Sequence, residues 1–145
     1  MSELTREEKQ ALIRAALDAR TRAVAPYSRF TVGAALRSAD GQVFTGCNIE
    51  NAAFTPTCCA ERTAFFEAVA KGERDFAAIA VVGGRNGEIT GLFPPCGVCR
   101  QVMMEFCEPD FLIHMGGAGD EIVTVPLGEF LPYGFNGEGQ LDKNS

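Results

Sequence analysis

The sequence predicts a three-layer α/β/α domain around a five-stranded mixed sheet. Segments with helical and strand patterns follow one another in the order helix, strand, strand, helix, strand, helix, strand, strand, helix. Strands interrupted by helices in this way favour a sheet that is covered on both faces. The length of 145 residues, 46% of them hydrophobic, suits a single domain with its own core. We expect one domain over residues 1–145, with a core to about residue 131 and a tail over 132–145.

The first predicted helix begins at Thr5 and ends before Pro26. Thr5 is a good N-cap residue, and Glu7 and Glu8 lie in the first turn, where the helix dipole favours acids. An apolar stripe at helical spacing follows, formed by Leu12, Ile13, Ala16 and Leu17. Val24 would extend this stripe towards Pro26.

Two strands over residues 31–37 and 42–46 are predicted next, and Asp40-Gly41 between them indicates a hairpin. Residues 59–71 have the pattern of a second helix, which Gly72 ends. The remaining predicted elements are a buried strand over 76–82, a loop over 83–95, a helix over 96–107, strands over 111–115 and 121–125, and a short helix over 126–131.

Charge and composition exclude several classes of function. The net charge is −6 and only 13 residues are Lys or Arg, whereas nucleic-acid binding depends on basic side chains that neutralise phosphates. We therefore expect a small neutral substrate and no nucleic acid. No apolar run reaches the roughly 18 residues of a membrane span. Residues 1–22 are charged throughout and lack the apolar stretch of a signal peptide, so we expect a cytoplasmic protein.

Two cysteine segments indicate a metal site. Cys96 and Cys99 are three positions apart at a predicted helix start, so both thiols can face one ion. Cys59 also opens a predicted helix, and Glu61 follows it by two positions. Three ligands are typical of a catalytic zinc site, which keeps a position for water and lowers the pKa of that water. The acid beside them would then move protons.

Spacing alone leaves two alternatives open among the cysteines. Cys58 and Cys59 are neighbours on one helix, and either could be the ligand. A noncatalytic zinc module would need a fourth ligand, for which Cys47, Cys58 and Cys107 are the available thiols. Otherwise we expect the cysteines outside the metal site to be small buried residues in a reducing cytosol.

The sequence resembles the small homotetrameric, zinc-dependent cytidine deaminases from about the first helix to Leu131. The handful of segments that support the resemblance, in this order, are Pro26–Phe30, Gly33–Leu36, Gly46–Ala52, Thr57–Ala64 and Pro94–Gln101. The combination of Cys-Ala-Glu with Pro-Cys-x-x-Cys-Arg-Gln is the signature of zinc deaminases in its three-cysteine form. The resemblance implies the cytidine deaminase-like fold, and deamination of cytidine and deoxycytidine in pyrimidine salvage.

The resemblance also implies a role for each residue near the metal. It selects Cys59 over Cys58, so that Cys59, Cys96 and Cys99 hold one zinc ion per chain. Glu61 is implied as the catalytic proton shuttle. Arg62 would donate to thiolate sulfur and so offset the negative charge of three thiolates on one Zn²⁺.

The implied substrate contacts come from other segments. Asn48 and Glu50 alternate along a predicted strand and so point to one face; the resemblance assigns them the ribose 3′-hydroxyl. Phe30 resembles the aromatic residue that lines the base. The backbone of Ala60 resembles the group that forms hydrogen bonds with the pyrimidine edge. Phe135 in the tail resembles a phenylalanine that enters a neighbouring subunit's site, which implies a homotetramer with composite sites and a tail partly at the subunit interface.

Two related activities compete with this interpretation. A deaminase of the blasticidin-S type would share the zinc segments but lack the Asn-x-Glu pair, so Asn48 and Glu50 favour cytidine. A polynucleotide-editing deaminase is disfavoured by the acidic charge. The only histidine, His114, lies in a predicted strand, whereas a His-x-Glu deaminase would need it where Cys59 stands; we expect a structural role for it.

Overall fold

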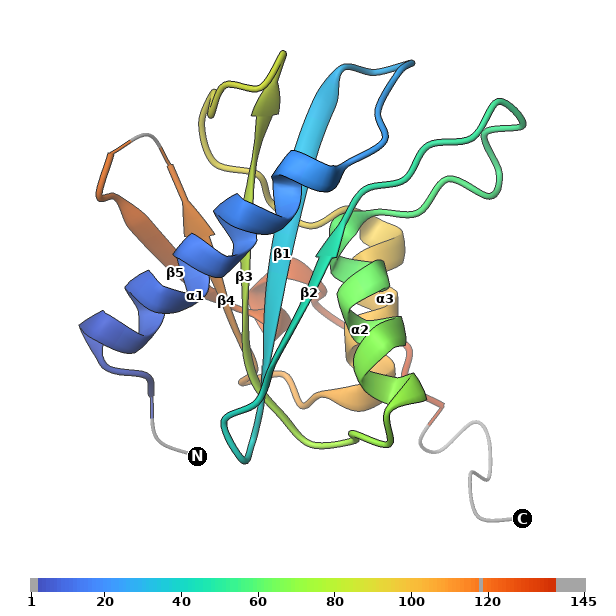
Figure 1. Ribbon diagram of the computed structural model, residues 1–145. Coiled ribbons are helices and arrows are strands. Elements are labelled where there is room, and N and C mark those ends of the chain that lie inside the picture. Colours follow the sequence, from blue (N-terminus) through green and yellow to red (C-terminus); the bar gives the residue numbers. More distant parts are fainter. Residues whose placement is uncertain (1–2, 118, 138–145) are drawn as a thin grey trace.

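A computed structural model describes residues 3–117 and 119–137 and shows the predicted three layers (Figure 1). The elements are α1 (Arg6–Ala19), η1 (Arg20–Arg22), β1 (Phe30–Ser38), β2 (Val43–Cys47), α2 (Ala60–Ala70), β3 (Phe76–Arg85), α3 (Gly97–Phe106), β4 (Leu112–Gly116), β5 (Ile122–Pro126) and α4 (Leu127–Phe130). None of the described helices is long and apolar enough to cross a membrane. Of the predicted tail, residues 138–145 lie outside the described residues.

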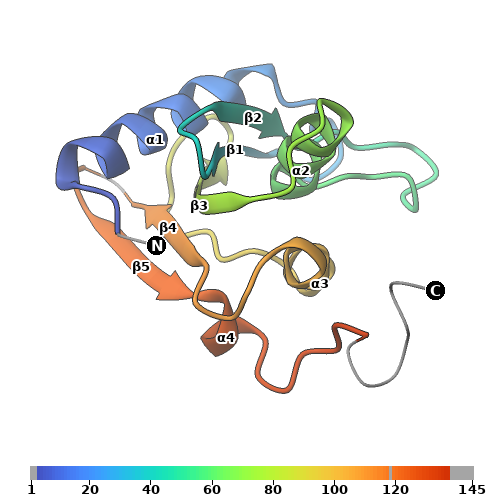
Figure 2. The same cartoon turned by 90° about the horizontal axis from the view of Figure 1, so that it is seen from below.

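The sheet is mixed, as predicted. Its strand order is β2-β1-β3-β4-β5; β3 and β4 are parallel, and every other neighbouring pair is antiparallel. Helix α1 packs on one face, whereas α2 and α3 lie on the opposite face (Figure 2). The parallel pair requires a crossover, and α3 provides it between β3 and β4.

The start of α1 agrees with the prediction, but its end does not. The Thr5 hydroxyl accepts a hydrogen bond from the backbone of Glu8, whose side chain accepts one from the backbone of Thr5, so the two form a capping box. The helix stops at Ala19, well before Pro26. Val24 therefore does not extend the apolar stripe: it is half-exposed and pairs through its backbone with Ile49.

Strand β3 is longer than predicted, because Gly83 and Gly84 continue it to Arg85 and do not begin a loop. A Cβ atom on Gly84 would lie 1.6 Å from the carbonyl oxygen of Glu88, and one on Gly83 would lie 2.9 Å from Cγ of Phe93. Both glycines are thus required by the close approach of the segment that follows β3, and not by a turn.

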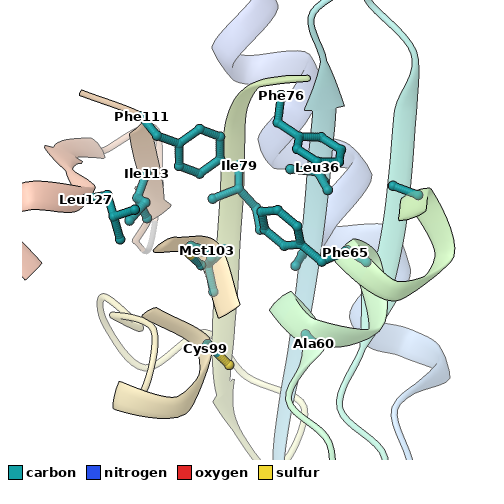
Figure 3. Packing of buried hydrophobic residues seen from close by; sticks show 14 of the residues in the cluster. Leu36, Ala60, Phe65, Phe76, Ile79, Cys99, Met103, Phe111, Ile113 and Leu127 are labelled. Carbon is teal, nitrogen blue, oxygen red and sulfur yellow. The ribbon is translucent and has the colours of Figure 1, made fainter. Parts of the chain in front are cut away.

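The larger core lies between the sheet and helices α2 and α3 (Figure 3). Its centre is Phe65, which is fully buried and packs edge-on against Phe76 with 5.1 Å between ring centroids. At one end of this core, Figure 3 shows Cys99 near the start of α3 and Ala60 at the start of α2. Packing of the two helices on one core therefore brings their N-terminal ends together.

His114 lies in β4 and is completely buried. Its Nδ1 is 2.7 Å from the hydroxyl of Thr124 on the neighbouring strand β5. Burial lowers the pKa of the imidazole to about 4, with a smaller contribution from Lys9, so His114 is neutral at physiological pH. These contacts agree with the structural role expected for this residue.

Candidate active site

Three thiols meet where helices α2 and α3 begin. Cys59 is the N-cap residue of α2, Cys96 is the N-cap residue of α3, and Cys99 lies in the first turn of α3. The Sγ atoms of Cys59 and Cys96 are 3.6 Å apart, and those of Cys96 and Cys99 are 3.4 Å apart. Among the described residues, these three form the group that could hold a metal ion, with all ligand atoms within 4.8 Å of one another.

The arrangement fits zinc. Four ligands at the Zn–S distance of about 2.3 Å in tetrahedral geometry place sulfur atoms about 3.8 Å apart, close to the observed separations of 3.4 and 3.6 Å. No fourth thiol among the described residues joins the group. The noncatalytic zinc module considered above therefore lacks the fourth cysteine that it would need.

The structure separates the two neighbouring cysteines. The backbone of Cys58 forms a short antiparallel bridge with Ile49, with N···O distances of 2.9 Å in both directions. The next residue, Cys59, directs its thiol into the metal-type group, whereas the Cys58 side chain lines the adjacent cavity. Spacing could not distinguish them; the bridge to Ile49 determines which one faces the group.

The charge at Cys59 is set by its neighbours. Hydrogen bonds with the Cys99 thiol and the Arg62 guanidinium lower the pKa of the Cys59 thiol to about 5, against the effect of burial. Arg62 Nη2 lies 3.5 Å from Cys59 Sγ and 3.5 Å from the carbonyl oxygen of Thr57. Arg62 is thus positioned to donate to the Cys59 sulfur, the role that the family resemblance implies for it.

Glu61 lies in the first turn of α2, beside the thiols, and only 4% of it is exposed. Burial raises the pKa of its carboxyl to about 7. Glu61 does not belong to the group of three thiols that could hold a metal ion. A buried acid of this kind next to a three-ligand group differs from the solvated acid that usually occupies the first turn of a helix.

A cavity of about 250 Å³ opens beside the thiols. Six of the predicted site residues line it: Asn48, Glu50, Cys59, Ala60, Glu61 and Cys96. Its other lining residues are Val32, Thr57, Cys58, Val81, Phe93 and Pro94. Four of the lining residues, Val32, Val81, Phe93 and Pro94, are apolar, as is common in small-molecule sites.

Asn48 lies just beyond the end of β2, which stops at Cys47, so the prediction that it belongs to a strand was wrong. The side chain of Asn48 ties this segment to β1. Its Oδ1 accepts a hydrogen bond from Val32 N–H (2.8 Å), and its Nδ2 donates to the Phe30 carbonyl (2.7 Å). An amide has two N–H donors, so one remains for a ligand.

Glu50 also lies past the strand, but on the same side as Asn48, since both line the cavity. Its Oε1 accepts hydrogen bonds from the backbone N–H groups of Tyr27 (3.0 Å) and Ser28 (3.1 Å), and its Oε2 accepts one from the Ser28 hydroxyl. These bonds hold the pKa of Glu50 below its usual value. A carboxylate has about four lone-pair positions, so Oε2 can accept one more donor.

Two predicted substrate contacts do not line the cavity. Phe30 stacks obliquely on Phe93, with ring centroids 5.6 Å apart, and Phe93 in turn forms part of the lining. Phe135 is 54% exposed and lies near α3, where its carbonyl accepts a hydrogen bond from Gln101 Nε2 (2.6 Å). Within the part of the chain that the structure describes, Phe135 does not reach the cavity of its own subunit.

A family model described as the cytidine and deoxycytidylate deaminase zinc-binding region matches residues 6–115. The chain belongs to this deaminase family. A cytidine deaminase of Halalkalibacterium halodurans is 47% identical over 135 residues, which cover 93% of this chain and 99% of that protein. A crystal structure of cytidine deaminase from Burkholderia pseudomallei has 49% identity and a TM-score of 0.80, covering 87% of this chain and 98% of that one. The Mycobacterium tuberculosis cytidine deaminase structure has 37% identity and a TM-score of 0.74, with 88% and 96% covered.

Membership of the deaminase family confirms the predicted resemblance, the fold and the enzyme class. The zinc-binding region of the family and the three grouped thiols together agree with one zinc ion per chain. Sequence reasoning missed Phe93 and Val32 as parts of the site. The only available signal for Phe93 was its position three residues before Cys96, in a segment that otherwise looked like an ordinary loop.

Proposed function

We propose that this protein catalyses the hydrolytic deamination of cytidine and deoxycytidine to uridine and deoxyuridine plus ammonia, as a step of pyrimidine salvage. The observation on which this depends is the buried carboxyl of Glu61 in one cavity with a three-thiol group and the polar pair Asn48 and Glu50. Relatives that are named cytidine deaminases support the substrate class.

The reaction replaces the amino group on C4 of the base by the oxygen of water. Zinc, when bound by the three thiols, supplies a water molecule whose pKa is lowered towards neutrality. Glu61 accepts a proton from the attacking water as the water oxygen bonds to C4, and delivers this proton to N3 of the ring. Glu61 then accepts the second proton from the new C4 hydroxyl and passes it to the amino group, so that the C4–N bond breaks, the C4 carbonyl forms and ammonia leaves. Burial beside the thiols suits Glu61 to this role, because few water molecules compete for its protons.

The base and sugar are held by groups that still have hydrogen-bonding capacity. Ala60 is the first residue of α2, so its N–H has no acceptor within the helix and can donate to the pyrimidine edge. The remaining N–H of Asn48 and the remaining lone pair of Glu50 Oε2 provide a donor and an acceptor in the same cavity. Such a pair matches a hydroxyl group, which both donates and accepts, and we assign it to the ribose 3′-hydroxyl.

Loss of absorbance at the cytidine maximum, with equimolar ammonia release, tests the proposal directly. Turnover of cytidine but not of cytosine would show that the sugar is recognised. Turnover of blasticidin S in the absence of cytidine turnover would contradict the assignment of the Asn48 and Glu50 pair.

We expect Glu50→Gln to lower kcat/KM for cytidine, because a charged acceptor for a sugar hydroxyl is lost. The loss should correspond to about 1.5–3 kcal/mol of binding free energy. Ser28→Ala is the matched control, since it removes the hydrogen bond from the Ser28 hydroxyl to Oε2 of the carboxylate and leaves the charge in place. Steady-state kinetics and a thermal melt on both variants separate the two roles. Equal kinetics for Glu50→Gln and the unmodified protein would show that Glu50 holds only the neighbouring segment.

We further propose a homotetramer in which Phe135 of one subunit completes the site of another. Phe135 is half-exposed and Tyr133 beside it is fully exposed, although both are large apolar or aromatic side chains. The hydrogen bond from Gln101 keeps this segment on α3 and outside its own cavity. An apolar group held outward in this way is better explained by a partner subunit than by the chain's own core.

Complementation between subunits tests the composite site. We expect Phe135→Ala and Glu61→Gln to be poorly active alone, whereas coexpression of the two should recover activity. A mixed oligomer contains sites with Glu61 from one subunit and Phe135 from the other. Additive, low activity of the coexpressed sample, or a fully active monomer in sedimentation velocity, would contradict the proposal.

We also propose a cytoplasmic location. All six cysteines are free thiols in the described structure, three of them close enough for oxidation to compete with metal binding. Thiols in this arrangement require a reducing compartment.

A further inference from the structure

Four of the residues that line the cavity are apolar, and we call them the apolar wall: Val32, Val81, Phe93 and Pro94. The polar groups already described come from the segments 48–50 and 57–61. Val32 and Val81 belong to neighbouring strands of the sheet, whereas Phe93 comes from the segment between β3 and α3. Phe93 has the largest side chain of the apolar wall.

The ring of Phe93 is held in place by its surroundings. It lies over Gly83 of β3: a Cβ atom on Gly83 would be 2.9 Å from Cγ of Phe93 and 3.0 Å from Cγ2 of Val32. On another side it contacts the ring of Phe30, with 5.6 Å between centroids. The absence of a side chain at Gly83 thus allows Phe93 to pack against the sheet. A side chain at position 83 would displace Phe93 and so change the width of the cavity.

The orientation of a bound pyrimidine follows from the proposed function, on which this inference rests. C4 must lie near the thiols and Glu61, and N1, across the ring from C4, must direct the sugar towards Asn48 and Glu50. Of the two remaining edges, the one with N3 and the C2 oxygen needs polar partners. The other, C5–C6, has only C–H groups and needs none, so it matches the apolar wall.

We propose that Phe93 is a specificity-determining residue, whose ring limits the size of the substituent that the enzyme accepts at C5 of the pyrimidine. Phe30 contacts the ring of Phe93 and acts on the substrate through it. Gly83 sets how far the ring extends into the cavity.

The experiment compares kcat/KM for 5-methylcytidine with kcat/KM for cytidine on each variant. The ratio of the two values removes any general loss of activity, because both substrates are measured on one preparation. One methylene group in an apolar pocket changes discrimination by roughly 10- to 200-fold. We therefore expect Phe93→Ala to raise the ratio by about tenfold or more.

Gly83→Ala should change the ratio in the opposite direction. Its new methyl group would push Phe93 and Val32 into the cavity, since these side chains are its nearest neighbours. The control is Val43→Ala, an exposed apolar position at the start of β2 that does not line the cavity. We expect no change of the ratio there. Zinc content of every variant shows that the metal site is intact.

A higher ratio for Phe93→Ala supports the inference, and a lower ratio for Gly83→Ala adds to that support. A ratio for Phe93→Ala within about twofold of the unmodified protein, with cytidine turnover retained, would overturn it. An equal fall for both substrates would also overturn it, since Phe93 would then only support the structure. Failure of the proposed function gives a different result: the unmodified protein would not deaminate cytidine.

Discussion

Glu61→Gln is expected to retain one zinc ion per chain and to lose most of its turnover of cytidine. The amide is nearly isosteric with the carboxyl, and Glu61 is not one of the grouped thiol ligands, so metal content should not change. The variant loses a group that can accept and return protons. A single general acid–base group contributes on the order of 10²–10⁴ in rate. Since Glu61 would serve several transfers, we expect the upper part of that range.

Glu67→Gln is the matched control for this experiment. Glu67 lies on the same helix, but its side chain is exposed and pairs with Lys71 at 3.0 Å. Its substitution should leave turnover unchanged. Normal turnover in Glu61→Gln would identify Glu61 as an ordinary helix acid, and loss of zinc would identify it as a ligand. Either result would contradict the proton-shuttle role.

Cys59→Ala is expected to abolish both zinc binding and activity, whereas Cys58→Ala should retain both. Cys59 provides one of only three thiols of the group, while the Cys58 side chain lines the cavity without joining them. The free energy of metal binding also stabilises the fold, so Cys59→Ala should unfold at a lower temperature as well. Metal analysis, a thermal melt and cytidine turnover on the two variants make the comparison.

The opposite pattern in the two cysteine variants would refute the ligand assignment. Retention of zinc by Cys59→Ala together with its loss from Cys58→Ala would mean that the backbone bridge between Cys58 and Ile49 does not direct the thiols as the structure shows. The unmodified protein, after zinc has been removed with a chelator, is the metal-free reference for both variants.

The sequence by itself determined the elements and the chemistry. Capping at Thr5, the Asp40-Gly41 turn and the two helix starts at Cys59 and Cys96 are local features, whose effect depends on neighbouring residues only. The thiols also follow from local spacing, because three positions on a helix place Cys96 and Cys99 on one side. These features sufficed to predict the three layers and a cysteine metal group with an acid beside it, whereas the choice of Cys59 over Cys58 came from the resemblance to the deaminase family.

Only the tertiary structure decided which apolar residues line the cavity. Phe93 and Val32 meet there because Gly83 allows a distant segment to lie against the sheet, and a glycine of this kind looks like the start of a loop in the sequence. The same holds for Cys58 and Cys59, which the bridge to Ile49 distinguishes, and for Asn48, which is held by β1. These positions depend on contacts between residues far apart in the chain, and such contacts leave no periodic or local pattern.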